Sequence, residues 1–183
     1  MDPELEKKLV SRAQAGDHRA FVELVDHYKT PVFNLIYRMT NGSLQESDDL
    51  AQETFLRSFA GLDGFDPQKR FFPWLYTICL NVIRNDMQKK TPALVAGHTL
   101  ANQPGKEEAG NPEALYAQHQ EKDMVQKGLL RLPEEQRAAI ILRYFQDLAY
   151  DDIAQILGLS ASGVKMRVKR GLANLRSHLH RKT

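Results

Sequence analysis

The stretch AYDDIAQILGLSASGVKMRVKR, at residues 149–170, has the pattern of a helix-turn-helix. Apolar residues recur at helical spacing across residues 150–157, which predicts a short first helix. Gly158 can adopt the positive φ that ends a helix, and Ser160 is a favoured cap for the helix that follows. The stretch therefore predicts two helices joined by a tight turn, an arrangement that inserts its second helix into the major groove of DNA.

The second helix of this motif is strongly basic. Residues 160–183 contain seven Lys or Arg and no Asp or Glu. At about 100° per residue, the apolar residues of this helix share one face, and we expect that face to pack on the rest of the domain. The inward residues are Val164, Val168, Leu172 and Leu175. The residues that we expect to face DNA are Ser162, Lys165, Met166, Arg167, Lys169 and Arg170.

Arg170 is the residue that we expect to read a base. An arginine can bond both major-groove acceptors of guanine, whereas lysines on the flanks of the helix suit phosphates and Met166 can offer only an apolar contact. The alternative is a solvated basic helix on an adaptor protein, because runs of charge are usually only surface. The short helix and turn that precede the basic stretch favour DNA binding.

Charge is distributed unevenly along the 183 residues, whose net charge is +2. Residues 1–90 hold 12 Lys and Arg against 13 Asp and Glu, and residues 91–123 hold 2 against 5. Residues 124–183 hold 11 against 5, a net charge of +6. The positive potential therefore lies in the last third of the chain, where it would attract phosphates.

Composition and cysteine content narrow the class of protein. The 42% of apolar residues can bury a modest core. Cys79 is the only cysteine, which excludes an internal disulfide framework. No apolar run approaches the ~20 residues that span a bilayer, and charged residues near the start replace the apolar core of a signal peptide. We expect a protein that is not inserted in a membrane and that works in the reducing cytoplasm.

The chain as a whole is expected to be all-α, since we find helical spacing and no strand pattern. Residues 91–120 contain three of the eight prolines, three glycines and little apolar periodicity. We therefore predict two small helical domains, at residues 1–91 and 123–183, joined by a flexible linker at residues 92–122. In the first domain the last helix is expected at residues 74–90, after a loop at residues 61–73.

One helix of the first domain combines a capping signal with an acidic patch. Ser43 and Glu46 have the spacing of a capping box, and the apolar face of the helix is expected to carry Leu50, Phe55, Phe59 and Leu62. The polar residues that lie off this face are Asp48, Asp49, Gln52 and Glu53. They suit a basic partner, although acidic residues near a helix start also have a purely local explanation in the helix dipole.

The sequence SDDLAQETFL, at residues 47–56, resembles the most recognisable stretch of bacterial sigma factors. The sequence WLYTICLN at residues 74–81, and Leu132-Pro133 ahead of the helix-turn-helix, follow it in the order typical of extracytoplasmic-function (ECF) sigma factors. The resemblance extends from about residue 20 to residue 179. It implies two helical domains, called region 2 and region 4, and a promoter-specificity subunit of RNA polymerase that catalyses nothing itself.

The resemblance also implies roles for particular residues. In the family, the acidic helix docks on the clamp helices of the polymerase β′ subunit, which assigns polymerase binding to Asp49, Gln52 and Glu53. The acidic patch adds Asp48 to this set. The helix-turn-helix is implied to bind the minus-35 promoter element beside the polymerase β flap. The partners implied are core RNA polymerase, promoter DNA and an anti-sigma factor, with no cofactor and no metal.

The loop before Trp74 and the helix that follows it are implied to hold the unpaired minus-10 strand. The residues assigned to this role are Phe65, Lys69, Arg70, Phe71, Phe72, Trp74, Asn81, Arg84, Asn85, Lys89 and Lys90. Aromatic rings supply stacking platforms, and cationic side chains supply a track for the backbone. Aromatic residues are also common in cores, which leaves Trp74 open between the two roles and favours the core for Phe71.

Two rival functions follow from the residues alone. The helix-turn-helix could belong to a stand-alone transcriptional regulator that binds DNA as a dimer. An enzyme is the weaker rival, because the sequence has no Gly-rich phosphate loop, no nucleophile elbow and no Cys/His metal spacing.

Overall fold

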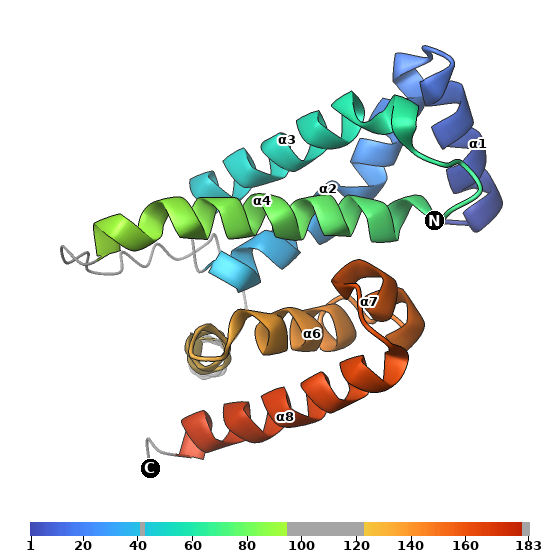
Figure 1. The fold of residues 1–183 in the computed structure, drawn as a ribbon. Coiled ribbons are helices and arrows are strands. Elements are labelled where there is room, and N and C mark those ends of the chain that lie inside the picture. Colours follow the sequence, from blue (N-terminus) through green and yellow to red (C-terminus); the bar gives the residue numbers. More distant parts are fainter. Residues whose placement is uncertain (41–42, 95–122, 181–183) are drawn as a thin grey trace, which may run out of the picture.

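The computed structural model describes residues 1–40, 43–94 and 123–180, and every regular element in these ranges is helical (Figure 1). The first group of helices comprises α1 (Pro3–Gln14), α2 (His18–Thr40), α3 (Leu44–Ala60), the short 3-10 helix η1 (Leu62–Gly64) and α4 (Phe71–Leu94). The second group comprises α6 (Glu134–Tyr144), α7 (Tyr150–Leu157) and α8 (Ala161–His180), and residues 123–130 are helical as well. The predicted all-α class is confirmed, while the predicted linker lies outside the described residues from residue 95 to residue 122.

Local capping fixes where the first helices begin. The side chain of Asp2 accepts hydrogen bonds from the backbone N–H groups of Glu4 and Leu5, at 3.0 and 3.1 Å, at the start of α1. The capping box at α3 is confirmed, because Ser43 Oγ accepts from Glu46 N at 3.1 Å and Glu46 Oε2 accepts from Ser43 N at 2.9 Å. The hydrogen bond from the Ser43 backbone lowers the pKa of Glu46.

Two prolines lie where the helices continue through them. Pro31 is inside α2, which runs as one helix from His18 to Thr40. Helix α4 begins at Phe71, three residues before Trp74, and Pro73 lies in its first turn. A proline in a first turn removes only an N–H group that has no partner inside the helix. The predicted start at residue 74 was therefore too late.

The inward face of α3 differs from the predicted one. Its buried residues are the small side chains Ser47, Ala51, Thr54 and Ser58, while Leu50 and Phe55 are half-buried and Phe59 is exposed. The hydroxyl groups of Thr54 and Ser58 donate to backbone carbonyls of their own helix at 2.8 Å. Because small residues face inward, α3 can pack closely between α2 and α4.

The helix-turn-helix is confirmed in its local detail. Gly158 has a φ of 64°, and Ser160 Oγ accepts from Gly163 N at 3.1 Å at the start of α8. Val164 and Val168 are buried as predicted, but Leu172 is 38% exposed. Gly171 is buried in its place, because α6 approaches α8 so closely that a Cβ at Gly171 would lie 2.8 Å from Ile140 Cδ1.

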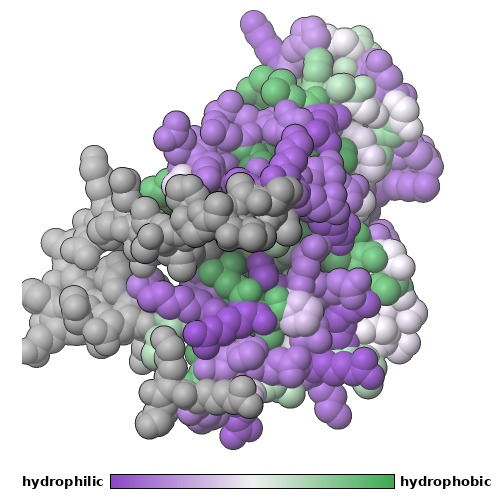
Figure 2. Space-filling model, turned by 60° about the vertical axis from the view of Figure 1, so that its left-hand side comes forward, coloured by the Kyte–Doolittle hydropathy of each residue, from purple (hydrophilic) through white to green (hydrophobic). Residues whose placement is uncertain are grey.

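The two groups of helices pack against each other. α6 contacts α2, and α7 contacts α4, while α8 covers α6 and α7 on the outer side (Figure 1). Buried apolar residues from both groups belong to one cluster. On the face drawn in Figure 2, hydrophilic residues predominate and hydrophobic residues form separate patches.

Candidate nucleic-acid interface

The recognition helix α8 presents a basic surface to solvent. Lys169 and Arg170 are exposed, Met166 is 50% exposed, and within the described residues neither cation has a hydrogen bond or an ion pair. Ser162 is also exposed. These residues stand where a base pair could reach them without a rearrangement of the domain.

The two flanking cations of α8 are engaged within their own domain. Arg167 Nη2 lies 2.9 Å from Glu135 Oε2 of α6, and Lys165 Nζ lies 5.5 Å from the centre of the Tyr150 ring. Arg167 is therefore paired with a carboxylate of α6, while Lys165 is exposed beside the first residue of α7.

The outer face of α3 carries the predicted acidic patch. Asp48, Asp49 and Gln52 are exposed, and Glu53 Oε1 accepts from Arg57 Nε at 2.6 Å one turn later. The sequence interpretation missed Leu56, which continues this face and is 66% exposed. The signal was its position, four residues after Gln52, which puts both side chains on one face of a helix.

The aromatic residues before and within α4 form a packed cluster. The ring of Phe65 lies 4.8 Å from the ring of Trp74, and Phe71 lies 5.5 Å from Trp74. Phe65, Phe71 and Phe72 are buried, and Trp74 is half-buried. As they lie here, the three phenylalanines are part of the core. This is the role that the sequence favoured for Phe71, whereas Phe65 and Phe72 do not present the open stacking surfaces that were expected of them.

The polar residues of α4 line one side of the helix. Asn81, Asn85 and Lys89 are exposed. Lys90 pairs with Asp86 at 2.9 Å and with Glu46 of α3 at 3.3 Å. Lys69, in the loop before α4, is exposed as well. The three lysines assigned to the cationic track are therefore at the surface, and Lys90 is paired with a residue of α3.

Family comparisons identify both groups of helices. A family model for sigma-70 region 2 matches residues 24–92, and a model for sigma-70 region 4 matches residues 122–175. The chain is 32% identical to the ECF RNA polymerase sigma factor SigW of Bacillus subtilis, over 94% of this chain and 96% of that protein. The chain belongs to the ECF sigma factors of RNA polymerase. The predicted resemblance is confirmed.

A further relative and two solved structures are also similar to this chain. The sigma factor is 31% identical to the ECF RNA polymerase sigma-E factor of Escherichia coli strain K12, over 88% of this chain and 87% of that protein. It is similar to the structure of CnrH in complex with the cytosolic domain of CnrY, with a TM-score of 0.74 and 25% identity over 98% of this chain and 99% of that one. It shares its fold with the sigma factor RpoE of Bartonella quintana, solved with the anti-sigma factor NepR, at a TM-score of 0.68 and 22% identity over 87% and 96% of the two chains.

We refer below to α1–α4 as the region 2 domain and to residues 123–180 as the region 4 domain. No helix in the described ranges of this sigma factor is long and apolar enough to cross a lipid bilayer. The site residues assigned to the minus-10 strand all belong to the region 2 domain, and those assigned to the minus-35 element all belong to α8.

In this sigma factor the region 4 domain covers part of the α4 surface. Arg84 Nε lies 2.6 Å from Glu134 Oε1 of α6, and Arg70 Nη1 lies 3.1 Å from Asp152 Oδ1 of α7. Arg70 also stacks on the ring of Phe72, 4.3 Å from its centre. Two of the cations assigned to the minus-10 strand therefore have carboxylate partners in the other domain.

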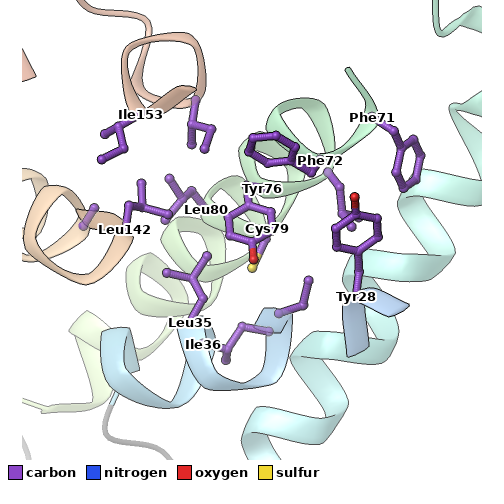
Figure 3. Close-up of a cluster of buried hydrophobic side chains, with 14 of the residues drawn as sticks. Tyr28, Leu35, Ile36, Phe71, Phe72, Tyr76, Cys79, Leu80, Leu142 and Ile153 are labelled. Carbon is purple, nitrogen blue, oxygen red and sulfur yellow. The ribbon is translucent and has the colours of Figure 1, made fainter. Parts of the chain in front are cut away.

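Apolar and neutral contacts complete the same interface. Figure 3 shows Phe72, Tyr76 and Leu80 of α4 between Leu35 and Ile36 on one side and Leu142 and Ile153 on the other. The Tyr76 hydroxyl donates to Gln146 Oε1 at 3.1 Å, and the hydroxyl of Thr77 lies 3.3 Å from the carbonyl of Ile156. Burial raises the pKa of the Tyr76 phenol, which keeps it a neutral donor.

A second set of contacts ties the end of α2 to the region 4 domain. Gln126 donates to the carbonyls of Tyr37 and Arg38 at 3.3 and 3.2 Å. Buried Arg137 donates to the carbonyl of Met39 and also to three carbonyls in residues 129–132. Arg38 lies over the ring of Phe145, 3.8 Å from its centre. Burial lowers the pKa of Arg38 and Arg137. The four backbone carbonyls that accept from Arg137 compensate the burial of its charge.

Proposed function

We propose that this sigma factor uses three separate surfaces in promoter recognition. The acidic face of α3 binds core RNA polymerase, the outer face of α8 binds the minus-35 element, and α4 with its preceding loop binds the unpaired minus-10 strand. The observation that carries the proposal is the position of the first two surfaces: α3 and α8 lie on opposite sides of the molecule, away from the contact between the domains (Figure 1). Polymerase and duplex DNA can therefore approach at the same time.

Polymerase docking is assigned to Asp48, Asp49, Gln52 and Glu53. Support comes from their exposure and negative charge, which suit a basic helical partner such as the β′ clamp helices. The exposed Leu56 adds an apolar contact on the same face. An interface needs such a core, because charges at a rim mainly steer association while apolar groups provide most of the affinity.

Minus-35 recognition is assigned to Arg170, with Ser162, Lys165, Met166, Arg167 and Lys169 around it. Arg170 is exposed on the outer face of α8. A bidentate contact from its guanidinium to a guanine would provide selectivity of about 1–3 kcal/mol against another base. The β flap of the polymerase is the proposed neighbour of this domain in the holoenzyme.

Minus-10 binding is assigned to Lys69, Arg70, Asn81, Arg84, Asn85, Lys89 and Lys90, with the aromatic cluster as their support. Arg70 and Arg84 are held by Asp152 and Glu134 of the region 4 domain. The domains must therefore separate before both arginines can contact a DNA strand. Phe72 and Trp74, at the edge of the cluster, are the aromatic residues that such an opening would make available for stacking.

Control by an anti-sigma protein is part of the proposal. The similar CnrH structure was solved in complex with the cytosolic domain of another protein. A partner that stabilised the contact between the two domains would keep the minus-10 residues covered. The proposed compartment is the cytoplasm, where core polymerase works, and in this proposal nucleotide addition is catalysed by the polymerase and not by the chain itself.

Run-off transcription with purified core polymerase on a promoter library tests the proposal. We expect transcripts from a defined subset of promoters only when the chain is present. A gel shift on the selected promoter duplex separates this function from that of a stand-alone regulator, because a single small helix-turn-helix should bind weakly without polymerase. Tight, specific binding without polymerase would contradict the proposed function.

A further inference from the structure

Helix α1 holds the loop that leads into α4 through a buried carboxylate. Glu6 is only 3% exposed. Its Oε1 accepts from the backbone N–H groups of Phe71 and Phe72, at 2.5 and 3.1 Å. Its Oε2 accepts from the hydroxyl of Tyr28 at 3.1 Å, which fixes the orientation of the carboxylate.

These hydrogen bonds cap the start of α4. The first N–H groups of a helix have no partner inside it and are usually satisfied by a local side chain. In α4 the first two helical residues are Phe71 and Phe72, and the third, Pro73, has no N–H group. Glu6 therefore satisfies the backbone N–H groups of both residues from a segment 65 residues away in the sequence. A negative charge at this position is also favoured by the helix dipole.

A second residue of α1 holds the other end of the same loop. Gln14 Nε2 donates to the carbonyl of Leu62 at 2.9 Å and to the carbonyl of Phe65 at 2.7 Å. Between the two ends, Lys7 Nζ donates to Gln68 Oε1 at 2.7 Å. One face of α1 thus contacts the loop from its beginning at η1 to the first turn of α4.

We propose that Glu6 and Gln14 are positioning residues for minus-10 recognition. They set the loop at residues 62–70 and the start of α4, and thereby place Arg70, Phe72 and Trp74 relative to the bound strand. Both lie before residue 24, where the match to the region 2 model begins, so this role belongs to the segment outside the family match. The inference rests on the proposed minus-10 function of the loop and α4.

Two substitutions distinguish a positioning role of Glu6 and Gln14 from a purely structural one. Gln14→Met keeps the size of the side chain but removes both donors, and Glu6→Gln keeps one acceptor oxygen but removes the charge. Lys8→Gln is the matched control, because Lys8 is an exposed residue of α1 that has no hydrogen bond or ion pair within the described residues. Each variant is assembled with core polymerase as a holoenzyme.

The measurement is the affinity of each holoenzyme for two labelled DNA probes. One is a fork-junction DNA with the unpaired minus-10 strand of a promoter that the wild-type holoenzyme transcribes, and the other is a duplex with the minus-35 element alone. We expect Gln14→Met and Glu6→Gln to weaken binding of the first probe about tenfold. Gln14→Met loses two hydrogen bonds to the loop, and Glu6→Gln loses the charge at the helix start and the oxygen that accepts from Tyr28. Binding of the second probe and of core polymerase should stay within about twofold of wild type.

Base selectivity is the readout that a structural role would not change. A positioning role requires that the ratio of affinities for the matched strand and a strand with one substituted base falls in the two variants and not in Lys8→Gln. An unchanged ratio, with only a lower thermal stability, would overturn the inference, and so would equal weakening of both probes. If Glu6→Gln does not fold, the half-buried Gln14→Met decides alone. If the wild-type holoenzyme shows no minus-10 selectivity, the proposed function fails rather than this inference.

Discussion

The contact between the two domains leads to a quantitative prediction about minus-10 binding. Glu134→Gln together with Asp152→Asn removes both ion pairs that hold Arg84 and Arg70, at 2.6 and 3.1 Å, and leaves the two arginines intact. The closed arrangement should lose stability relative to the open one. Because DNA binds only the open arrangement in our proposal, the double variant should bind the minus-10 strand more tightly.

The size of the effect follows from the exposure of the pairs. The side chains of Arg84 and Glu134 are 38% and 31% exposed, and those of Arg70 and Asp152 are 46% and 18% exposed. Solvent screens such half-exposed pairs, which are typically worth about 0.2–1 kcal/mol each. A loss of about 1 kcal/mol for the two together shifts the equilibrium about fivefold towards the open state. The apparent dissociation constant for the strand should fall by the same factor while the closed state dominates.

Fluorescence anisotropy of a labelled single-stranded minus-10 oligonucleotide, measured on the sigma factor without polymerase, checks this value. The double variant also removes two negative charges, and this change alone would favour the binding of any polyanion. The matched control is Glu135→Gln with Asp151→Asn, which makes the same charge change in the first turns of the same two helices. Glu135 pairs within the region 4 domain, so this control leaves the contact between the domains intact.

Two results would refute the reasoning. The control could tighten binding as much as the test variant, which would reduce the effect to net charge. Alternatively, the test variant could bind no more tightly than wild type at low ionic strength, where the ion pairs are least screened. A rise in the radius of gyration by small-angle scattering, seen only in the test variant, would independently support opening.

Four further predictions concern single surfaces and the core. Arg170→Ala should lower holoenzyme affinity for the minus-35 duplex by about tenfold or more while core polymerase still co-purifies, and an unchanged affinity would remove this residue from base reading. Gln52→Ala with Glu53→Ala should reduce co-purification of polymerase without affecting the thermal unfolding midpoint. Gly171→Val should lower the free energy of unfolding by about 1–3 kcal/mol in urea, because its Cβ would lie 2.8 Å from a buried side chain of α6. Burial raises the pKa of the Cys79 thiol from 9.0 to about 12, so the thiol should react with a thiol reagent only after the protein unfolds. The unfolded chain loses the thiol proton at a lower pH than the folded protein, so the free energy of unfolding should fall as the pH rises from 9.0 to about 12.

Local patterns predicted several elements because their causes lie within a few residues. The capping box at Ser43 and the turn at Gly158 depend only on neighbours up to four residues away, and both formed as predicted. The apolar spacing correctly gave the inward positions of Val164 and Val168. It failed at Leu172, because the neighbouring Gly171 allows α6 to approach and takes the inward position itself.

The sequence predicted some parts of the candidate site better than others, because some of its features depend on distant residues. The exposed residues of α3 and α8 could be assigned by which face of a helix they share. The family resemblance assigns residues by their place in a motif and does not tell whether an aromatic ring lies at the surface, so Phe65 and Phe72 were placed among the binding residues although they are buried. The carboxylate partners of Arg70 and Arg84 could not be found either, since they lie 82 and 50 residues further along the chain.

The sequence by itself determined the helical class, the basic recognition helix, the acidic face of α3 and the family to which the chain belongs. These features depend on residues that are only a few positions apart, because local hydrogen bonding and side-chain periodicity act over that range. Only the tertiary structure decided that Glu6 and Gln14 hold the loop before α4 and that carboxylates of the region 4 domain pair with Arg70 and Arg84. Such contacts depend on how segments that are distant in the sequence pack together, and the spacing of residue types does not reveal that packing.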